Sequence, residues 1–206
     1  MKKFELTSEF VTFLGKKLFR IKALVSFGDV KEGELGGLVE KEENLDQSGD
    51  AWVYGDAQVS GDAQVSGDAR VYGDAWVSGN AQVSGDAQVY GDAQVYGDAR
   101  VYGDARVSGD ARVYGDAQVS GDARVSGNAR VQNCRDYSAT SCFGSENRTT
   151  TFFHTKDGGI GVRCGCFYGT LAEFREKVKE RHGDSRTAKE YLMLADLMEF
   201  RLSKDE

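Results

Sequence analysis

The sequence predicts an all-β solenoid, a parallel β-helix of stacked coils, because a six-residue repeat fills the middle of the chain. Units such as GDAWVY, GDAQVS and GDARVY follow one another without an insertion over residues 49–131, fourteen in all. The chain has 26 glycines and no proline, which indicates one kind of turn used many times. A single unit cannot bury an apolar face alone, whereas stacked coils can.

Each unit divides into an extended half and a turn. Ala and Val lie two residues apart, so an extended Ala-x-Val segment points both side chains to one face. The Gly-Asp or Gly-Asn pair supplies the turn, because both residue types tolerate a positive φ and Asx side chains bond the nearby backbone. Ala and Val are therefore expected inside, where each buried valine contributes on the order of 1.5 kcal/mol.

An aliphatic residue followed four places later by a small one, as in Val53 and Ala57, resembles the hexapeptide-repeat left-handed β-helix. The resemblance implies a left-handed coil of three units, so residues 18 apart should stack in columns. Fourteen units then make just under five coils, and the solenoid should be roughly 20 Å tall at ~4.8 Å between strands.

The flanks of the repeat resemble hexapeptide proteins of bacterial genomes and prophages, some of which are labelled transferases. Before the repeat, the resemblance lies in FRIKAL (19–24), FGDV (27–30) and GELGGLVE (33–40). After it, RCGCFYGTL (163–171) and HGD (182–184) are similar to a terminal module often attached to such proteins. Together with the repeat, these segments imply the architecture of almost the whole chain.

Residues 1–48 should form an N-terminal β cap and a degenerate first coil. Solenoid ends expose unpaired strand edges and an open core, so natural solenoids are capped. Alternating apolar residues on both sides of GKK, within residues 3–27, predict a β-hairpin. Residues 35–39 and Leu45 are typical of a degenerate coil.

Residues 132–206 should close the other end with a β-hairpin and two helices, a ββαα cap. Residues 149–154 and 160–167 predict the hairpin, because the turn sequence KDGG separates them. The expected organisation is thus a cap, the repeat over 49–131, and a terminal module.

The two predicted helices follow that hairpin. Thr170 and Glu173 make a capping box that opens a helix to about residue 182, and Gly183 stops it. A second helix over about 186–202 carries apolar residues at three- and four-residue steps. That stripe should pack on the hairpin rather than stand in water.

Aromatic side chains follow or precede several of the repeat valines and should point outward. Such a patch can anchor a protein partner, although stacked tyrosines can also simply stabilise a sheet. The regular threonine rows of ice-binding solenoids are missing. The candidate partner-binding residues are Trp52, Tyr54, Tyr72, Tyr90, Trp76, Tyr96 and Tyr114.

Aspartates at the turns should stack into acidic columns. Residues 49–131 hold 6 Arg and 12 Asp, a charge of −6 out of the total of −7. This field could imitate a nucleic-acid backbone and disfavours direct nucleic-acid binding. Turn formation also explains these residues, and calcium-binding β-rolls have a different period. One such column is Asp50, Asp68, Asp86, Asp104 and Asp122.

The repeat lacks the groups that transferase chemistry needs. Acyltransferases built on the resembled solenoid use a histidine base and projecting loops, commonly where subunits meet. The repeat has neither, and His154 and His182 lie in the terminal module, where a structural role is expected. No catalytic residue and no cofactor are therefore assigned.

The four cysteines have two interpretations. Cys164 and Cys166 should share a strand face, and Cys134 and Cys142 could complete a zinc tetrad. The usual two-residue spacing of zinc cysteines is absent. Buried reduced thiols are the favoured interpretation.

No run of 18 apolar residues and no secretory h-region occur, so a cytoplasmic protein without a membrane segment is expected. These observations favour a non-enzymatic interaction scaffold, an accessory protein of a phage or prophage that binds a host protein. Self-association into a homo-oligomer stays open. The alternative is an acyltransferase-like hexapeptide enzyme active at an oligomer interface.

Overall fold

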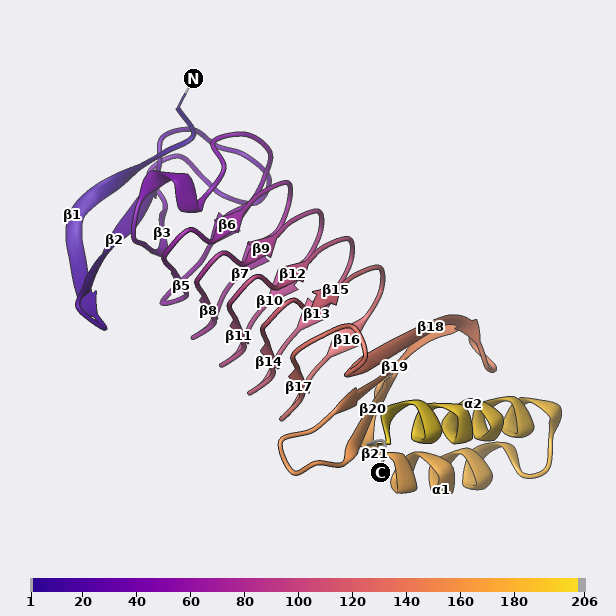
Figure 1. The fold of residues 1–206 in the computed structure, drawn as a ribbon. Helices are drawn as coiled ribbons and strands as arrows, with labels where there is room; N and C mark the ends of the chain where they lie inside the picture. Colours follow the sequence, from indigo (N-terminus) through magenta and orange to yellow (C-terminus); the bar gives the residue numbers. More distant parts are fainter. Residues whose placement is uncertain (1, 204–206) are drawn as a thin grey trace.

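The computed structural model describes residues 2–203 and shows a β-solenoid closed by different structures at its two ends (Figure 1). A β-hairpin lies at the start, about five coils follow, and a four-stranded sheet with two helices lies at the end. The predicted capped solenoid is confirmed. The left-handed sense of the coil stays a prediction.

Every six-residue unit contributes one two-residue strand, and three such strands complete a coil. Strands 18 residues apart pair in parallel, as Val53 pairs with Val71 and Val71 with Val89, so the predicted columns are confirmed. The first face consists of β4 (Trp52–Val53), β7 (Arg70–Val71), β10 (Gln88–Val89), β13 (Arg106–Val107) and β16 (Arg124–Val125). The second face begins with β3 (Leu35–Val39) and continues with β5 (Gln58–Val59), β8 (Trp76–Val77), β11 (Gln94–Val95), β14 (Arg112–Val113) and β17 (Arg130–Val131). The third face consists of β6 (Gln64–Val65), β9 (Gln82–Val83), β12 (Arg100–Val101) and β15 (Gln118–Val119).

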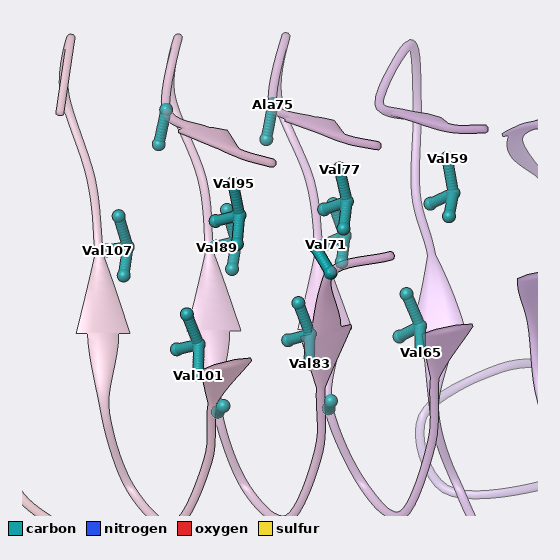
Figure 2. Close-up of a cluster of buried hydrophobic side chains, with 14 of the residues drawn as sticks. Val59, Val65, Val71, Ala75, Val77, Val83, Val89, Val95, Val101 and Val107 are labelled. Atoms are coloured by element: carbon teal, nitrogen blue, oxygen red, sulfur yellow. The ribbon is translucent and has the colours of Figure 1, made fainter. Parts of the chain in front are cut away.

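The interior holds only the alanines and valines of the repeat along most of its length. All of them are fully buried, and Figure 2 shows the valines in rows along the axis. Hydrogen bonds between coils satisfy the backbone, as when Gln58 N donates to Ala75 O over 2.9 Å. The parallel ladder therefore provides a frame in which outward side chains occupy fixed positions.

The turns require glycine for two physical reasons. Gly85 has a φ of +67°, a region that L-residues with a side chain rarely adopt. A Cβ on Gly85 would also lie 3.0 Å from the backbone nitrogen of Gly103 in the next coil. Turns like this one thus need glycine both for their own conformation and for the close approach of the next coil, whereas Gly55 and Gly121, with open space where a Cβ would lie, need it for conformation alone.

The first coil is assembled by the N-terminal cap. β1 (Phe4–Phe13) and β2 (Lys16–Ala23) form the predicted hairpin, and β2 pairs with β3 (Leu35–Val39). A 3-10 turn (Glu42–Asn44) follows, and Leu45 bridges to Val65 in parallel. Because β3 pairs in parallel with β5, this segment is the degenerate coil that was predicted.

The C-terminal sheet has two more strands than the predicted hairpin. Its order is β18 (Tyr137–Phe143), β19 (Arg148–His154), β20 (Ile160–Cys164) and β21 (Phe167–Thr170). The prediction of one strand over 160–167 was wrong, because Gly165 has a φ of +58° and turns the chain there. β18 was missed, since its polar sequence has no clear alternation.

The two helices have the predicted bounds, α1 (Leu171–His182) and α2 (Arg186–Leu202). Thr170 Oγ1 accepts from Glu173 N over 3.2 Å, and the Glu173 carboxylate accepts from Thr170 N over 2.7 Å, so the capping box is formed. Gly183 ends α1 as predicted. The apolar stripe of α2, which includes buried Tyr191 and Met198, packs with the sheet, as predicted.

Candidate functional site

The first face of the solenoid carries a pair of parallel tyrosine rings. Parallel pairing of β7 with β10 places Tyr72 and Tyr90 in adjacent coils, and their ring centroids lie 4.9 Å apart with an interplanar angle of 0°. Tyr72 Oη donates to Gln88 Oε1 over 3.4 Å. Burial raises the pKa of Tyr72 above its usual value, and the neighbouring Tyr90 raises it further by a smaller amount. Both rings are half-buried, so they retain an exposed edge.

A second pair repeats this arrangement on the second face. Tyr96 and Tyr114 stack with centroids 5.2 Å apart and an angle of 10°. Tyr102, after the next strand of the chain, is 39% exposed. The structure therefore stacks four of the five predicted tyrosines in pairs, each pair within one column.

Trp52 does not belong to the outer patch, and this part of the prediction was wrong. Its side chain is fully buried between Phe4 and Phe27, whose rings meet it edge-on at 6.2 and 5.4 Å. The N-terminal cap covers the first coil, so a position that points outward elsewhere in the repeat becomes core there. Tyr54 is half-buried against the same core, and burial raises its pKa.

Trp76 also makes a contact that the repeat alone does not predict. Its Nε1 donates to Ser60 Oγ over 3.4 Å, and the ring of Phe13 packs edge-on at 5.5 Å. Phe13 lies at the end of β1, so the hairpin tip reaches the second face of the solenoid. The ring stays partly exposed.

A groove of about 420 Å³ lies beside the first-face tyrosines, between their column and the neighbouring polar column. Arg70 Nη2 lies 2.7 Å from Asp29 Oδ2 in this groove. Asp29 was missed as a lining residue, because it belongs to the loop between β2 and β3 and no repeat signal marks it. The lining residues are Asp29, Tyr54, Arg70, Tyr72 and Gln88.

The aspartates of the predicted acidic column are all exposed and stack along one corner. Asp68 Oδ1 accepts from Asp50 N of the preceding coil over 3.1 Å, so this carboxylate bonds the backbone of the neighbouring turn. On another corner, Asn80 Nδ2 donates to Asp98 Oδ1 over 2.9 Å, which relieves repulsion within that column. The column members are Asp50, Asp68, Asp86, Asp104 and Asp122.

The expectation that the four cysteines are buried was wrong. Cys134, Cys142 and Cys166 are exposed, and Cys164 is half-buried. Cys166 lies in the turn after β20, so it does not share a strand face with Cys164. Within residues 2–203, no group of three or more potential ligands is arranged to hold a metal ion.

The histidines make contacts inside the terminal module. His154 Nε2 lies 2.7 Å from Leu202 O, and its Nδ1 lies 3.4 Å from Asp136 Oδ1. This pair lines a hollow of about 740 Å³ between the solenoid end and the helices. The ring of His182 lies 5.8 Å from that of Tyr191.

Among the described residues, no helix combines the length and apolar character needed to cross a lipid bilayer.

The YdcK beta solenoid repeat family model matches residues 63–79, 81–97, 93–107, 105–121 and 123–134. These ranges begin 18, 12, 12 and 18 residues apart, which are whole numbers of six-residue units. A search of curated proteins found no match. The chain is thus a β-solenoid repeat protein by both its structure and its repeat.

Proposed function

We propose that this protein is a non-enzymatic interaction scaffold, an accessory protein of a phage or prophage, which binds a host protein through Tyr72, Tyr90 and the groove beside them. The groove residues Tyr54, Arg70 and Gln88 would supply the polar rim. Such a surface combines rigid aromatic anchors with hydrogen-bonding groups, as protein-binding sites often do.

The observation that carries this proposal is the parallel stack of Tyr72 on Tyr90. The next two coils have Ser108 and Ser126 at the equivalent positions, and their backbone ladder continues unchanged. The fold therefore tolerates serine there. Rings held in place by the coil ladder lose little conformational entropy on binding, which favours affinity.

The alternative is an acyltransferase-like hexapeptide enzyme that works at an oligomer interface. Its strongest support is the hollow that contains His154. The Nε2 of His154 is engaged by the carbonyl of Leu202, so this nitrogen would have to leave that contact to act as a base. Thermal shift with coenzyme A, acyl-coenzyme A and nucleotide sugars separates the two proposals, since a large saturable shift would favour the enzyme.

The test of the scaffold uses the immobilised protein and lysate of the host, followed by titration of the purified partner. The variant Tyr72→Ser/Tyr90→Ser should weaken binding by at least about tenfold, as loss of an aromatic anchor does. The matched control Tyr96→Ser/Tyr114→Ser removes the other stack and should bind normally. Equal affinity of both variants and the wild type would contradict the proposal.

A third variant separates aromatic recognition from acidic mimicry. Asp68→Asn, Asp86→Asn and Asp104→Asn use a residue that the repeat already has at position 80. If the acidic column imitates a phosphate backbone, this variant should lose binding, and binding should fall steeply with salt. Aromatic recognition predicts normal binding and a weak salt dependence.

A further inference from the structure

Two cysteines with one residue between them, Cys164 and Cys166, lie at the hairpin turn of the terminal module. Cys164 is the last residue of β20 and pairs with Phe167 of β21, so the turn consists of Gly165 and Cys166. Two Cα atoms separated by one residue are at most about 7 Å apart, and closer in a turn. A disulfide needs a separation of roughly 4.4 to 6.8 Å.

Both cysteines line one small cavity of about 90 Å³, between the turn and the two helices. The floor of this cavity is apolar and includes Phe174 and Val178. Its charged lining is Arg148, Lys177, Arg181 and Glu146, a net charge of +2, and Lys177 also pairs with Glu180 at 2.8 Å. Arg148 lies against the turn, because a Cβ on Gly165 would be 3.0 Å from its guanidinium. An acidic ligand is therefore favoured here over a neutral one.

The two sulfur atoms differ in their surroundings. Cys166 is exposed and so accessible to an incoming disulfide. Cys164 is half-buried, and its Sγ accepts from the fully buried hydroxyl of Thr150 over 3.2 Å. It also lies 3.9 Å from Tyr191 Oη, and burial, together with Cys164, raises the pKa of that phenol. A fixed hydroxyl donor stabilises negative charge on Cys164, both when its thiolate attacks to close a disulfide and when it leaves as that disulfide is reduced again.

We propose that Cys164 and Cys166 are a reversible dithiol–disulfide pair that exchanges with an acidic low-molecular-weight disulfide of the glutathione class. The Cys166 thiolate attacks one sulfur of that disulfide, which forms a mixed disulfide and releases the first thiol. The Cys164 thiolate then attacks Cys166 Sγ, which closes the internal disulfide and releases the second thiol. The protein dithiol is oxidised, one disulfide is reduced to two thiols, and the two cysteine protons pass to them.

The chain offers a clean assay, because trypsin separates the Cys164–Cys166 pair from the other two cysteines. Cleavage after arginine and lysine places both members of the pair in CGCFYGTLAEFR (164–175), whereas Cys134 lies in VQNCR and Cys142 in DYSATSCFGSENR. Folded full-length protein is incubated with oxidised glutathione, quenched with an alkylating reagent, digested and analysed by mass spectrometry. Peptide 164–175 should be unalkylated and lighter by two hydrogens, while the other two peptides are mainly alkylated.

Two variants test whether Cys164 resolves the mixed disulfide and whether the positive charge of the cavity selects an acidic disulfide. Cys164→Ser should leave a stable glutathione adduct on Cys166. In the wild type, excess reduced glutathione should return the oxidised peptide to its dithiol form. Lys177→Gln/Arg181→Gln should lower the oxidation rate by oxidised glutathione by about tenfold, but not the rate by the neutral disulfide of 2-mercaptoethanol. The proposal is overturned if peptide 164–175 keeps a glutathione adduct in the wild type, or if Cys134 and Cys142 react as fast as the pair.

Discussion

Phe152 and Phe153 are neighbours in the chain, and their side chains lie in two different hydrophobic cores. Phe153 is fully buried at the end of the solenoid, in one cluster with the repeat alanines and valines. Phe152 is fully buried in the other core, where its ring meets that of Phe174 edge-on at 5.9 Å. Because side chains alternate along a strand, β19 forms a wall shared by both cores.

This shared wall predicts different local effects of two matched substitutions. Phe153→Ala should open the last coil, and Phe152→Ala should loosen α1 and α2, each at a cost of about 3–5 kcal/mol. Hydrogen exchange should show lost protection in β15 to β17 for the first variant and in the helices for the second. An identical exchange pattern in both variants would show that the two cores unfold as one unit.

The glycine turns predict a difference between two Gly→Ala substitutions. Both Gly55 and Gly85 have a positive φ, so alanine at either position should cost roughly 1–2 kcal/mol of backbone strain. Only Gly85 faces another coil within 3.0 Å, whereas a Cβ on Gly55 meets nothing within 4 Å. Urea unfolding should therefore show Gly85→Ala as clearly the more destabilised, and equal stabilities would argue against close stacking of the turns.

We expect ionisation of Tyr137 to contribute to the loss of stability of the protein at alkaline pH. Its hydroxyl donates to Gln118 O over 2.7 Å, and burial raises its pKa above the usual value of 10.0. A raised pKa means that the phenol stabilises the folded state fully below pH 10 and progressively less as the pH rises through the folded-state value. Tyr137→Phe should lose about 1 kcal/mol at pH 7. Urea unfolding at pH 8 and at pH 10.5 should show that the free energy of unfolding falls less between these two pH values in the variant than in the wild type.

The stacked tyrosines should matter less for stability than for binding. Ring stacking contributes about 0.5–1.5 kcal/mol beyond burial, and each ring is only half-buried, so Tyr72→Ser/Tyr90→Ser should destabilise the protein without unfolding it. Thermal denaturation of this variant should remain cooperative and close to that of Tyr96→Ser/Tyr114→Ser. A collapse of the fold in the first variant alone would assign the Tyr72 stack a structural role.

The local pattern of the repeat determined most of the architecture. Alanine and valine two residues apart must share a strand face, and glycine must occupy a turn with positive φ, wherever the unit occurs. The helices were equally predictable, because the capping box at Thr170 and the stop at Gly183 are local signals. These features depend on residues within one turn or one coil.

The positions that tertiary structure decided are those where distant segments meet. Trp52 has the outward position of every other unit, and only the arrival of Phe4 and Phe27 makes it core. The periodicity gives no sign of this, because burial depends on what lies above a side chain and not only on the face to which it points. In the same way, the sequence by itself determined the tyrosine columns, whereas the groove beside them needed Asp29, which the folded loop brings within 2.7 Å of Arg70.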